Sequence, residues 1–221
     1  MKKSIIYILF IAALACNSSD DNRADIIKQM VDEVSYLSSD ELEGRETGTE
    51  GEMKAAEYIS SKFLEYGLIG KGTEGFLQTF EASIKENPHS NAIKKKIKAT
   101  NVVGYLDNNQ KETIIIGAHY DHIGYGDFSS LYDGEREIHN GADDNASGVS
   151  IMLNLAQSLN KVKNYNYLFI GFSGEELGLF GSSHYAKNPT IDLDNVRFMI
   201  NFDMVGRLNT EKTLAINGIG T

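Results

Sequence analysis

The stretch TIIIGAH, residues 113–119, sets the expected fold of this chain. Its apolar run is short, continuous and rich in β-branched residues, which is typical of a strand buried on both faces of a mainly parallel sheet. Similar runs occur at residues 167–172 and 196–202, and helix-like stretches at residues 149–159 and 179–187 follow the first two strands. Strands that alternate with helices predict an α/β sandwich with a mostly parallel central sheet.

Two helices and two strands are predicted upstream of this run. Apolar residues at three- and four-residue spacing indicate amphipathic helices over residues 24–39 and 51–67. Strand-like runs follow at residues 76–84 and 97–106, joined by a basic, proline-containing connection. The loop over residues 42–51, rich in glycine and charge, is interpreted as a capped turn between the helices.

The composition is that of a globular, exported protein. The chain has 221 residues, of which 41% are hydrophobic and 24% charged, and its net charge of -10 argues against a nucleic-acid partner, since phosphate binding needs a basic face. Lys2 and Lys3 precede an apolar run that is too short to span a bilayer. This arrangement predicts a signal peptide over residues 1–15.

The sequence ALAC, residues 13–16, resembles a bacterial lipobox, which would make Cys16 the lipidated first residue of the mature chain. Cys16 is the only cysteine, and the polar residues 16–23 suit a tether; a plain signal peptide is the alternative. We therefore expect a protein held to the membrane by a lipid anchor. Its expected location is the cell envelope, either at the cell surface as an outer-membrane lipoprotein or in the periplasm.

Chemically reactive side chains follow each of the three buried runs, at the point where the run ends. Because parallel strands present their carboxyl ends at one edge of a sheet, we expect these side chains to meet there. A fourth group stands directly before the predicted helix over residues 149–159. The groups are HYDH at residues 119–122, SGEE at 173–176, Asp203, and GADDNASG at 141–148.

Each group has an ordinary alternative when it is taken alone. His119 could simply end a strand, and an aspartate of residues 143–144 could cap the next helix. The glutamates of residues 175–176 suit a first helical turn, and Asp203 could open a turn. Together, however, these groups would repel one another unless cations neutralised them. One histidine with three carboxylates suits zinc, with other divalent ions as alternatives, and a bridging carboxylate would hold two ions about 3.5 to 4 Å apart.

Asp121 is predicted to assist this site without binding metal. It lies two residues beyond His119 and so points to the same side of an extended chain. Its carboxylate is therefore expected to accept a hydrogen bond from the second ring nitrogen of His119 and to orient the imidazole.

At this point four motifs resemble the successive signatures of a known family. GAHYDH (117–122), HNGADDNASG (139–148), GFSGEELGLFGS (171–182) and NFDMVG (201–206) are similar to those of the zinc-dependent aminopeptidases of clan MH, the bacterial leucyl aminopeptidase and aminopeptidase Y group. The resemblance extends over most of residues 36–206. It implies a three-layer sandwich of the phosphorylase/hydrolase-like, zinc exopeptidase type, with residues 24–221 as the catalytic domain.

The resemblance also implies a role for each site residue. His119 and Asp203 would bind one zinc, Asp144 would bridge both, and Glu176 would bind the second. Glu175 falls in the position of the general base, which takes a proton from the attacking water and gives it to the leaving amine. The implied substrate is a peptide, whose free amino terminus is drawn to the acidic site and whose N-terminal bond is cut.

The sequence departs from the family pattern in one respect. Members complete the second zinc site with a histidine downstream of the position of Asp203, and the eighteen residues after Asp203 contain none. The nearby candidates to replace it are His122, His139 and His184. We expect all three to be ordinary polar residues, because His122 and His139 lie in the loop around the first zinc and His184 lies on the helix after Glu176. Residues 213–216 predict a further buried strand with no helix after it to cover it, so we expect the sequence to be a fragment.

Two other functions are compatible with these residues. The first is a glutaminyl-cyclase-like or carboxypeptidase relative, which would share the fold and much of the ligand set. The second is a catalytically silent binding module. Neither the preferred substrate side chain nor the oligomeric state is indicated by the sequence.

Overall fold

A computed structural model describes residues 22–85, 93–127, 130, 134–213 and 215–218. The predicted signal peptide and Cys16 lie outside the described residues, as does most of the predicted connection between the two upstream strands. Export and lipid anchoring therefore stay predictions from the sequence. Within the described part of the chain, no helix is both long and apolar enough to cross a bilayer.

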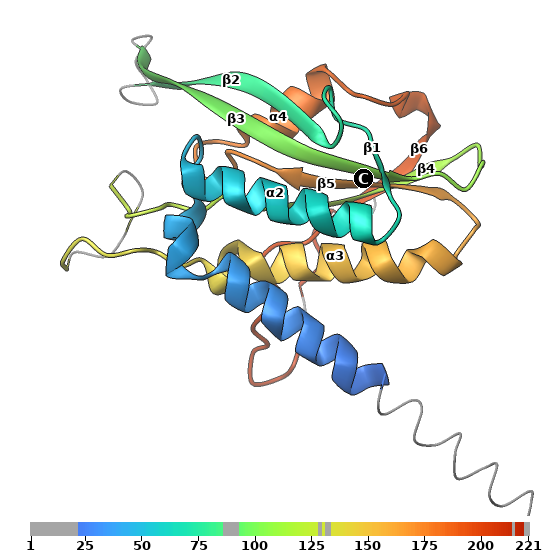
Figure 1. Ribbon diagram of the computed structural model, residues 1–221, viewed down its shortest axis with the longest axis horizontal. Coiled ribbons are helices and arrows are strands. Elements are labelled where there is room, and N and C mark those ends of the chain that lie inside the picture. Colours follow the sequence, from blue (N-terminus) through green and yellow to red (C-terminus); the bar gives the residue numbers. More distant parts are fainter. Residues whose placement is uncertain (1–21, 86–92, 128–129, 131–133, 214, 219–221) are drawn as a thin grey trace, which may run out of the picture.

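The described strands form one six-stranded mixed sheet (Figure 1). Strand β4 lies between β5 and β6 and runs parallel to both, whereas β3 runs antiparallel to β1, β2 and β5. The predicted α/β sandwich is confirmed, and its parallel part holds the three strands expected to carry the site. The other part is antiparallel, and it consists of the pairs that β3 forms with β1, β2 and β5. The strands are β1 (Ile69–Gly70), β2 (Leu77–Lys85), β3 (Ile93–Leu106), β4 (Thr113–His119), β5 (Asn166–Phe172) and β6 (Val196–Asn201).

Helices cover both faces of this sheet. Helices α2 (Glu50–Glu65) and α3 (Gly148–Ser158) lie side by side on one face, with the helix over residues 22–37 next to them, and α4 (Phe180–Lys187) lies on the other (Figure 1). Short 3-10 segments at Asp40–Arg45, Leu159–Lys161 and Leu193–Asn195 and a π-type segment at Ala142–Ser147 complete the elements. The predicted helices and upstream strands are thus present, with ends shifted by a few residues.

The central strands show why this sequence packs into three layers. Every residue of β4 is buried. Ile114 and Ile116 belong to the core under α2 and α3, whereas Ile115 joins the core on the α4 side, with Tyr185. Because successive side chains of a strand point to opposite faces, a continuous apolar run can satisfy a core on each side at once.

Two predicted buried strands are corrected by the structure. Strand β6 forms, but Phe198, Met199 and Ile200 are 47%, 46% and 42% exposed. Among the described residues, β6 pairs with β4 alone and so forms an edge of the sheet, which leaves its apolar side chains half open. The described residues of 213–216 form no strand, and Ile216 is 74% exposed. A short apolar run becomes a strand only where a neighbouring strand is aligned with it, and sequence alone does not supply that neighbour.

Candidate metal centre

The predicted site residues meet at one edge of the sheet, where the parallel strands end. His119 is the last residue of β4 and is paired in register with Phe172, the last residue of β5. The chain after β5 carries Glu175 and Glu176, and the chain after β6 carries Asp203. The segment Ala142–Ser147, which leads into α3, brings Asp144 to the same place.

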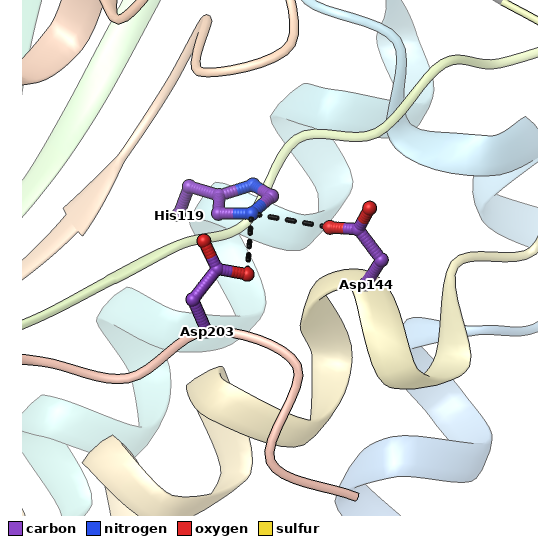
Figure 2. Close-up of side chains that lie close together, drawn as sticks. All are labelled: His119, Asp144 and Asp203. Carbon is purple, nitrogen blue, oxygen red and sulfur yellow. Dashed lines mark ion pairs between the residues drawn. The ribbon is translucent and has the colours of Figure 1, made fainter. Parts of the chain in front are cut away.

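His119, Asp144 and Asp203 form the first potential metal-binding group (Figure 2). The Nε2 atom of His119 lies 3.2 Å from Oδ1 of Asp144 and 3.4 Å from Oδ1 of Asp203. The imidazole is buried at 3% exposure, while the two carboxylates are 35% and 47% exposed. One cation could therefore contact all three side chains and remain accessible from solvent.

The charges around His119 favour a positive charge at its ring. Burial lowers the pKa of His119, but the neighbouring carboxylates of Asp121, Asp144 and Asp203 outweigh burial and raise the pKa to about 11. The pKa of Asp144 is lowered in turn, chiefly by its hydrogen bond with His119. A cation that binds Nε2 would therefore compete with a proton for this nitrogen.

A second group consists of His122, Asp144 and Glu176. The Nδ1 atom of His122 lies 2.6 Å from Oε1 of Glu176. Asp144 belongs to both groups, which is the arrangement expected of a bridging carboxylate. The expectation that His122 is an ordinary polar residue near the first zinc does not describe its position, because it lies beside the predicted ligand of the second. In the sequence, the position of His122 directly after Asp121, just beyond a strand that carries a ligand, could have indicated that it lies near the metal site.

Asp121 is fully buried. The Nδ1 atom of His119 is 3.2 Å from the backbone oxygen of Asp121 and 3.7 Å from its Oδ1, so the side-chain contact is longer than a hydrogen bond. The carboxylate instead accepts the backbone N–H groups of Glu175 and Glu176 at 3.1 Å and 3.4 Å, and the hydroxyl of Thr47 at 3.0 Å. Asp121 thus holds the loop of both glutamates, a contact that sequence reasoning did not anticipate.

Glu175 lines a small cavity of about 150 Å³ together with His119 and Asp203. The wall also includes the apolar side chains of Phe172, Leu179 and Met199. Burial is the main reason why the pKa of Glu175 is raised above its ordinary value. A carboxylate with a raised pKa beside a metal-binding group is suited to accept and release a proton there.

Asp143, the aspartate next to Asp144, has different partners. Its Oδ1 accepts the backbone N–H of Gly206 at 2.8 Å, and its backbone oxygen accepts the hydroxyl of Ser147 at 2.7 Å. Arg207 lies 3.5 Å from its Oδ2. Asp143 therefore ties the loop after β6 to the segment that carries Asp144.

Asn145 is a further residue of the site that sequence reasoning missed. Its side chain is fully buried, and its amide nitrogen donates to the backbone oxygens of His119 at 3.2 Å and Phe202 at 2.9 Å. Its Oδ1 accepts the N–H groups of Gly148 at 3.0 Å and Met204 at 3.2 Å. One amide thus joins the ends of β4 and β6 to the start of α3. Only its position next to Asp144 in the motif could have indicated this.

Glu52 is a buried carboxyl under the same loop. Its Oε2 accepts the N–H of Gly48 at 2.6 Å as part of the predicted capped turn, and its Oε1 contacts the hydroxyls of Ser173 and Tyr120. The pKa of Glu52 is raised to about 8, and burial is the main cause. The carboxyl is therefore neutral in the folded protein over much of the range in which an exposed glutamate is charged.

Replacing Glu52 by Gln should change how stability depends on pH. Between pH 4.5, the ordinary pKa of the group, and about 8, the folded protein keeps a proton that the unfolded chain has lost. The free energy of unfolding therefore falls as pH rises through this window, by up to about 1.4 kcal/mol for each pH unit. Glu52→Gln can keep the contacts to Gly48 and Ser173 without this penalty. Urea unfolding at pH 5 and pH 8 should show that the free energy of unfolding falls less between these pH values for the variant than for the unaltered protein. Equal decreases would contradict the raised pKa of Glu52.

Residues 101–220 match Peptidase family M28. The aminopeptidase YwaD of Bacillus subtilis is 31% identical over 146 residues, which are 63% of this chain and 28% of YwaD. The chain thus spans less than half the length of this curated relative.

Solved structures agree with the observed fold. A Zn-dependent exopeptidase from Parabacteroides distasonis superposes with a TM-score of 0.65 at 22% identity, over 81% of this chain and 61% of that chain. A glutaminyl cyclase from Tannerella forsythia gives a TM-score of 0.64 at 24% identity, over 81% of this chain and 62% of that chain. At these identities the two structures establish the zinc exopeptidase type of fold and not the reaction.

The family assignment rests on the matched segment. This segment is more than half of the chain, and it contains the ends of β4, β5 and β6 with every residue of both potential metal-binding groups. The chain belongs to Peptidase family M28.

Proposed function

We propose that this chain carries the two-zinc centre of an aminopeptidase, which hydrolyses the N-terminal bond of peptides. The observation that carries the proposal is the position of Asp144, whose carboxylate belongs to both potential metal-binding groups. A shared carboxylate is the usual link between two catalytic metal ions. The aminopeptidase YwaD, 31% identical over 146 residues, supports the same reaction class.

The donor atoms of both groups fit zinc. Zinc is held in proteins by imidazole nitrogens and carboxylate oxygens, and a catalytic ion keeps one position open. The first group offers His119, Asp144 and Asp203, and the second offers His122, Asp144 and Glu176. Zinc bound at these groups would polarise the scissile carbonyl and make the attacking water more acidic.

Glu175 is the proposed general base. Its carboxylate lines the cavity beside His119 and Asp203, and its raised pKa, caused chiefly by burial, increases its affinity for a proton. It would take a proton from the attacking water and release it to the leaving amine nitrogen. Asp121 supports this step because it accepts the backbone N–H of Glu175 and so fixes the loop.

The acidic surroundings favour an exopeptidase that acts on free amino termini. Asp203 and Glu175 line a cavity of about 150 Å³, which has room for the end of a peptide rather than for a long stretch of chain. A protonated terminal amine would be attracted to these carboxylates. An acetylated amine has no such charge.

The experiment that tests this function combines metal analysis with substrate profiling. Purified protein should contain zinc and release the arylamine from aminoacyl arylamides, and it should not act on the N-acetylated forms. Treatment with a chelator should abolish the activity, and added zinc should restore it. A protein that binds zinc and cuts neither substrate would contradict the aminopeptidase proposal and favour the silent binding module.

Glutaminyl cyclisation is the second candidate, because the Tannerella forsythia glutaminyl cyclase shares the fold with a TM-score of 0.64. Mass spectrometry of a peptide that begins with glutamine separates the two reactions. An aminopeptidase shortens this peptide by one residue, whereas a cyclase removes ammonia and leaves the number of residues unchanged. We expect the shortened peptide.

A further inference from the structure

Arg45 is a buried arginine whose donors are directed at the backbone. It is 1% exposed. Its Nε donates to the oxygen of Tyr120 at 2.7 Å, one terminal nitrogen donates to the oxygens of Leu37 and of Asn140, the latter at 2.8 Å, and the other donates to the oxygen of Gly141 at 3.0 Å. One rigid guanidinium group therefore holds four carbonyl groups in place.

Three of these four carbonyl groups belong to segments that carry metal-binding side chains, and the fourth, of Leu37, ends the helix over residues 22–37. Tyr120 stands between His119 and Asp121, at the end of β4. Asn140 and Gly141 stand directly before the segment Ala142–Ser147, which contains Asp144. Arg45 thus connects the segment of His119 with the segment of Asp144, although the two are far apart in the sequence.

The backbone of residues 43–45 also contacts the chain near these segments. Glu43, Gly44 and Arg45 all have positive φ angles, of 46°, 68° and 49°. The oxygen of Arg45 accepts the N–H of His122 at 3.1 Å, and a Cβ atom on Gly44 would lie 2.5 Å from the backbone oxygen of His139. Non-glycine residues hold left-handed angles only where their surroundings impose them. A simple capped turn between two helices does not require this conformation.

Burial of a positive charge also opposes folding, which is unfavourable for a residue that only supports the fold. Burial lowers the pKa of Arg45 to about 10, while the charges of Asp121, Asp144 and Glu176 act in the opposite direction. The guanidinium therefore lies within electrostatic reach of the acidic groups of both metal-binding groups. The cost of burying this charge is offset by its hydrogen bonds to the four carbonyl oxygens.

We propose that Arg45 is a positioning residue of the metal centre, which sets the distance between His119 and Asp144 through the backbone carbonyls of their segments. This inference rests on the proposed zinc site. The charge of Arg45 by itself opposes the binding of a cation, so any gain in zinc affinity from Arg45 comes from the placement of the ligands. A lysine at position 45 separates the two effects, because it keeps the charge and has one nitrogen in place of the fork that reaches four carbonyls.

The test measures zinc affinity in the absence of substrate. Arg45→Lys should bind zinc 10- to 100-fold more weakly than the unaltered protein in a competition with a chromophoric chelator, which is the usual effect of losing a residue that orients metal ligands. The matched control is Arg197→Lys, on β6, whose side chain is 60% exposed and lies 3.6 Å from Glu112. This control should keep the original affinity. A folded Arg45→Lys protein with unchanged zinc affinity would overturn the inference, whereas an unaltered protein without zinc would instead refute the proposed function.

A second variant covers the case in which Arg45→Lys does not fold. Arg45→Ala leaves a space lined by the four carbonyl groups, and millimolar guanidinium should fill it and restore both the folded state and zinc binding. Methylammonium, which lacks the planar fork, should restore neither. If guanidinium restores the fold but leaves zinc affinity at the level found without it, or restores neither property, the contacts of Arg45 do not position the ligands.

Discussion

Glu175→Gln should bind zinc as the unaltered protein does and lose about 10²- to 10⁴-fold in turnover, which is the range that a positioned acid–base group contributes. Gln has nearly the same shape as Glu and can occupy the same place beside the cavity. It cannot accept a proton at neutral pH, so the attacking water keeps its proton and the leaving amine receives none. Turnover of an aminoacyl arylamide and zinc content should be measured on the same preparation.

The matched control for this change is Glu57→Gln, an exposed glutamate on α2. This substitution makes the same chemical change far from the strand ends that carry the ligands. It should leave turnover and zinc content unchanged. Two results would contradict the role of Glu175. One is retained turnover in Glu175→Gln, and the other is a loss of zinc in parallel with activity, which would make Glu175 a ligand.

Asp144→Asn should abolish the binding of both zinc ions. Substitution of a residue that belongs to only one of the two groups should chiefly abolish the binding of one ion. Asp144 is the residue common to the two groups, and its lowered pKa keeps it ionised at neutral pH. The amide has no charge to balance two cations that lie about 3.5 to 4 Å apart. Asp203→Asn and His122→Ala each leave the other group complete. Metal analysis after dialysis against zinc should therefore give about two ions for each chain in the unaltered protein, about one for each of these two variants and close to none for Asp144→Asn.

Asp143→Asn is the matched control, because it is the neighbouring aspartate with the same change. Asp143 accepts the N–H of Gly206 and contacts Arg207, and it is not needed to complete either group. It should keep the metal content of the unaltered protein. A loss of both ions in Asp143→Asn with retention in Asp144→Asn would reverse the assignment of the bridge.

The strand ends explain why much of the site could be predicted from the sequence. The apolar run that ends at His119 predicts both a buried strand and the edge at which it stops, and the same reasoning locates Glu175 and Asp203. Convergence of these residues follows from the parallel direction of the strands alone. The failure at β6 has the opposite origin, since an apolar run shows that a strand is suited to burial and not that neighbours are present to bury it.

The supporting residues were beyond the reach of sequence reasoning for a different reason. Arg45, Glu52 and Asn145 act on backbone groups or on hydroxyls far along the chain. Backbone carbonyls are present at every position and leave no trace in the residue types. For a charged residue in a glycine-rich loop, the sequence alone therefore predicts an exposed turn, even where the fold buries the side chain.

The bridge proposed for Asp144 would have a consequence for the unfolded chain. His119, Asp144, Glu176 and Asp203 come from four separate segments, which the unfolded chain holds far apart. Ions bound at the two groups would act as reversible cross-links that close these loops only in the folded state, so their binding energy adds to the free energy of folding. With a single cysteine in its sequence, the chain can form no disulfide within itself. Its cross-links would then be set by the supply of metal rather than by the redox state of the compartment.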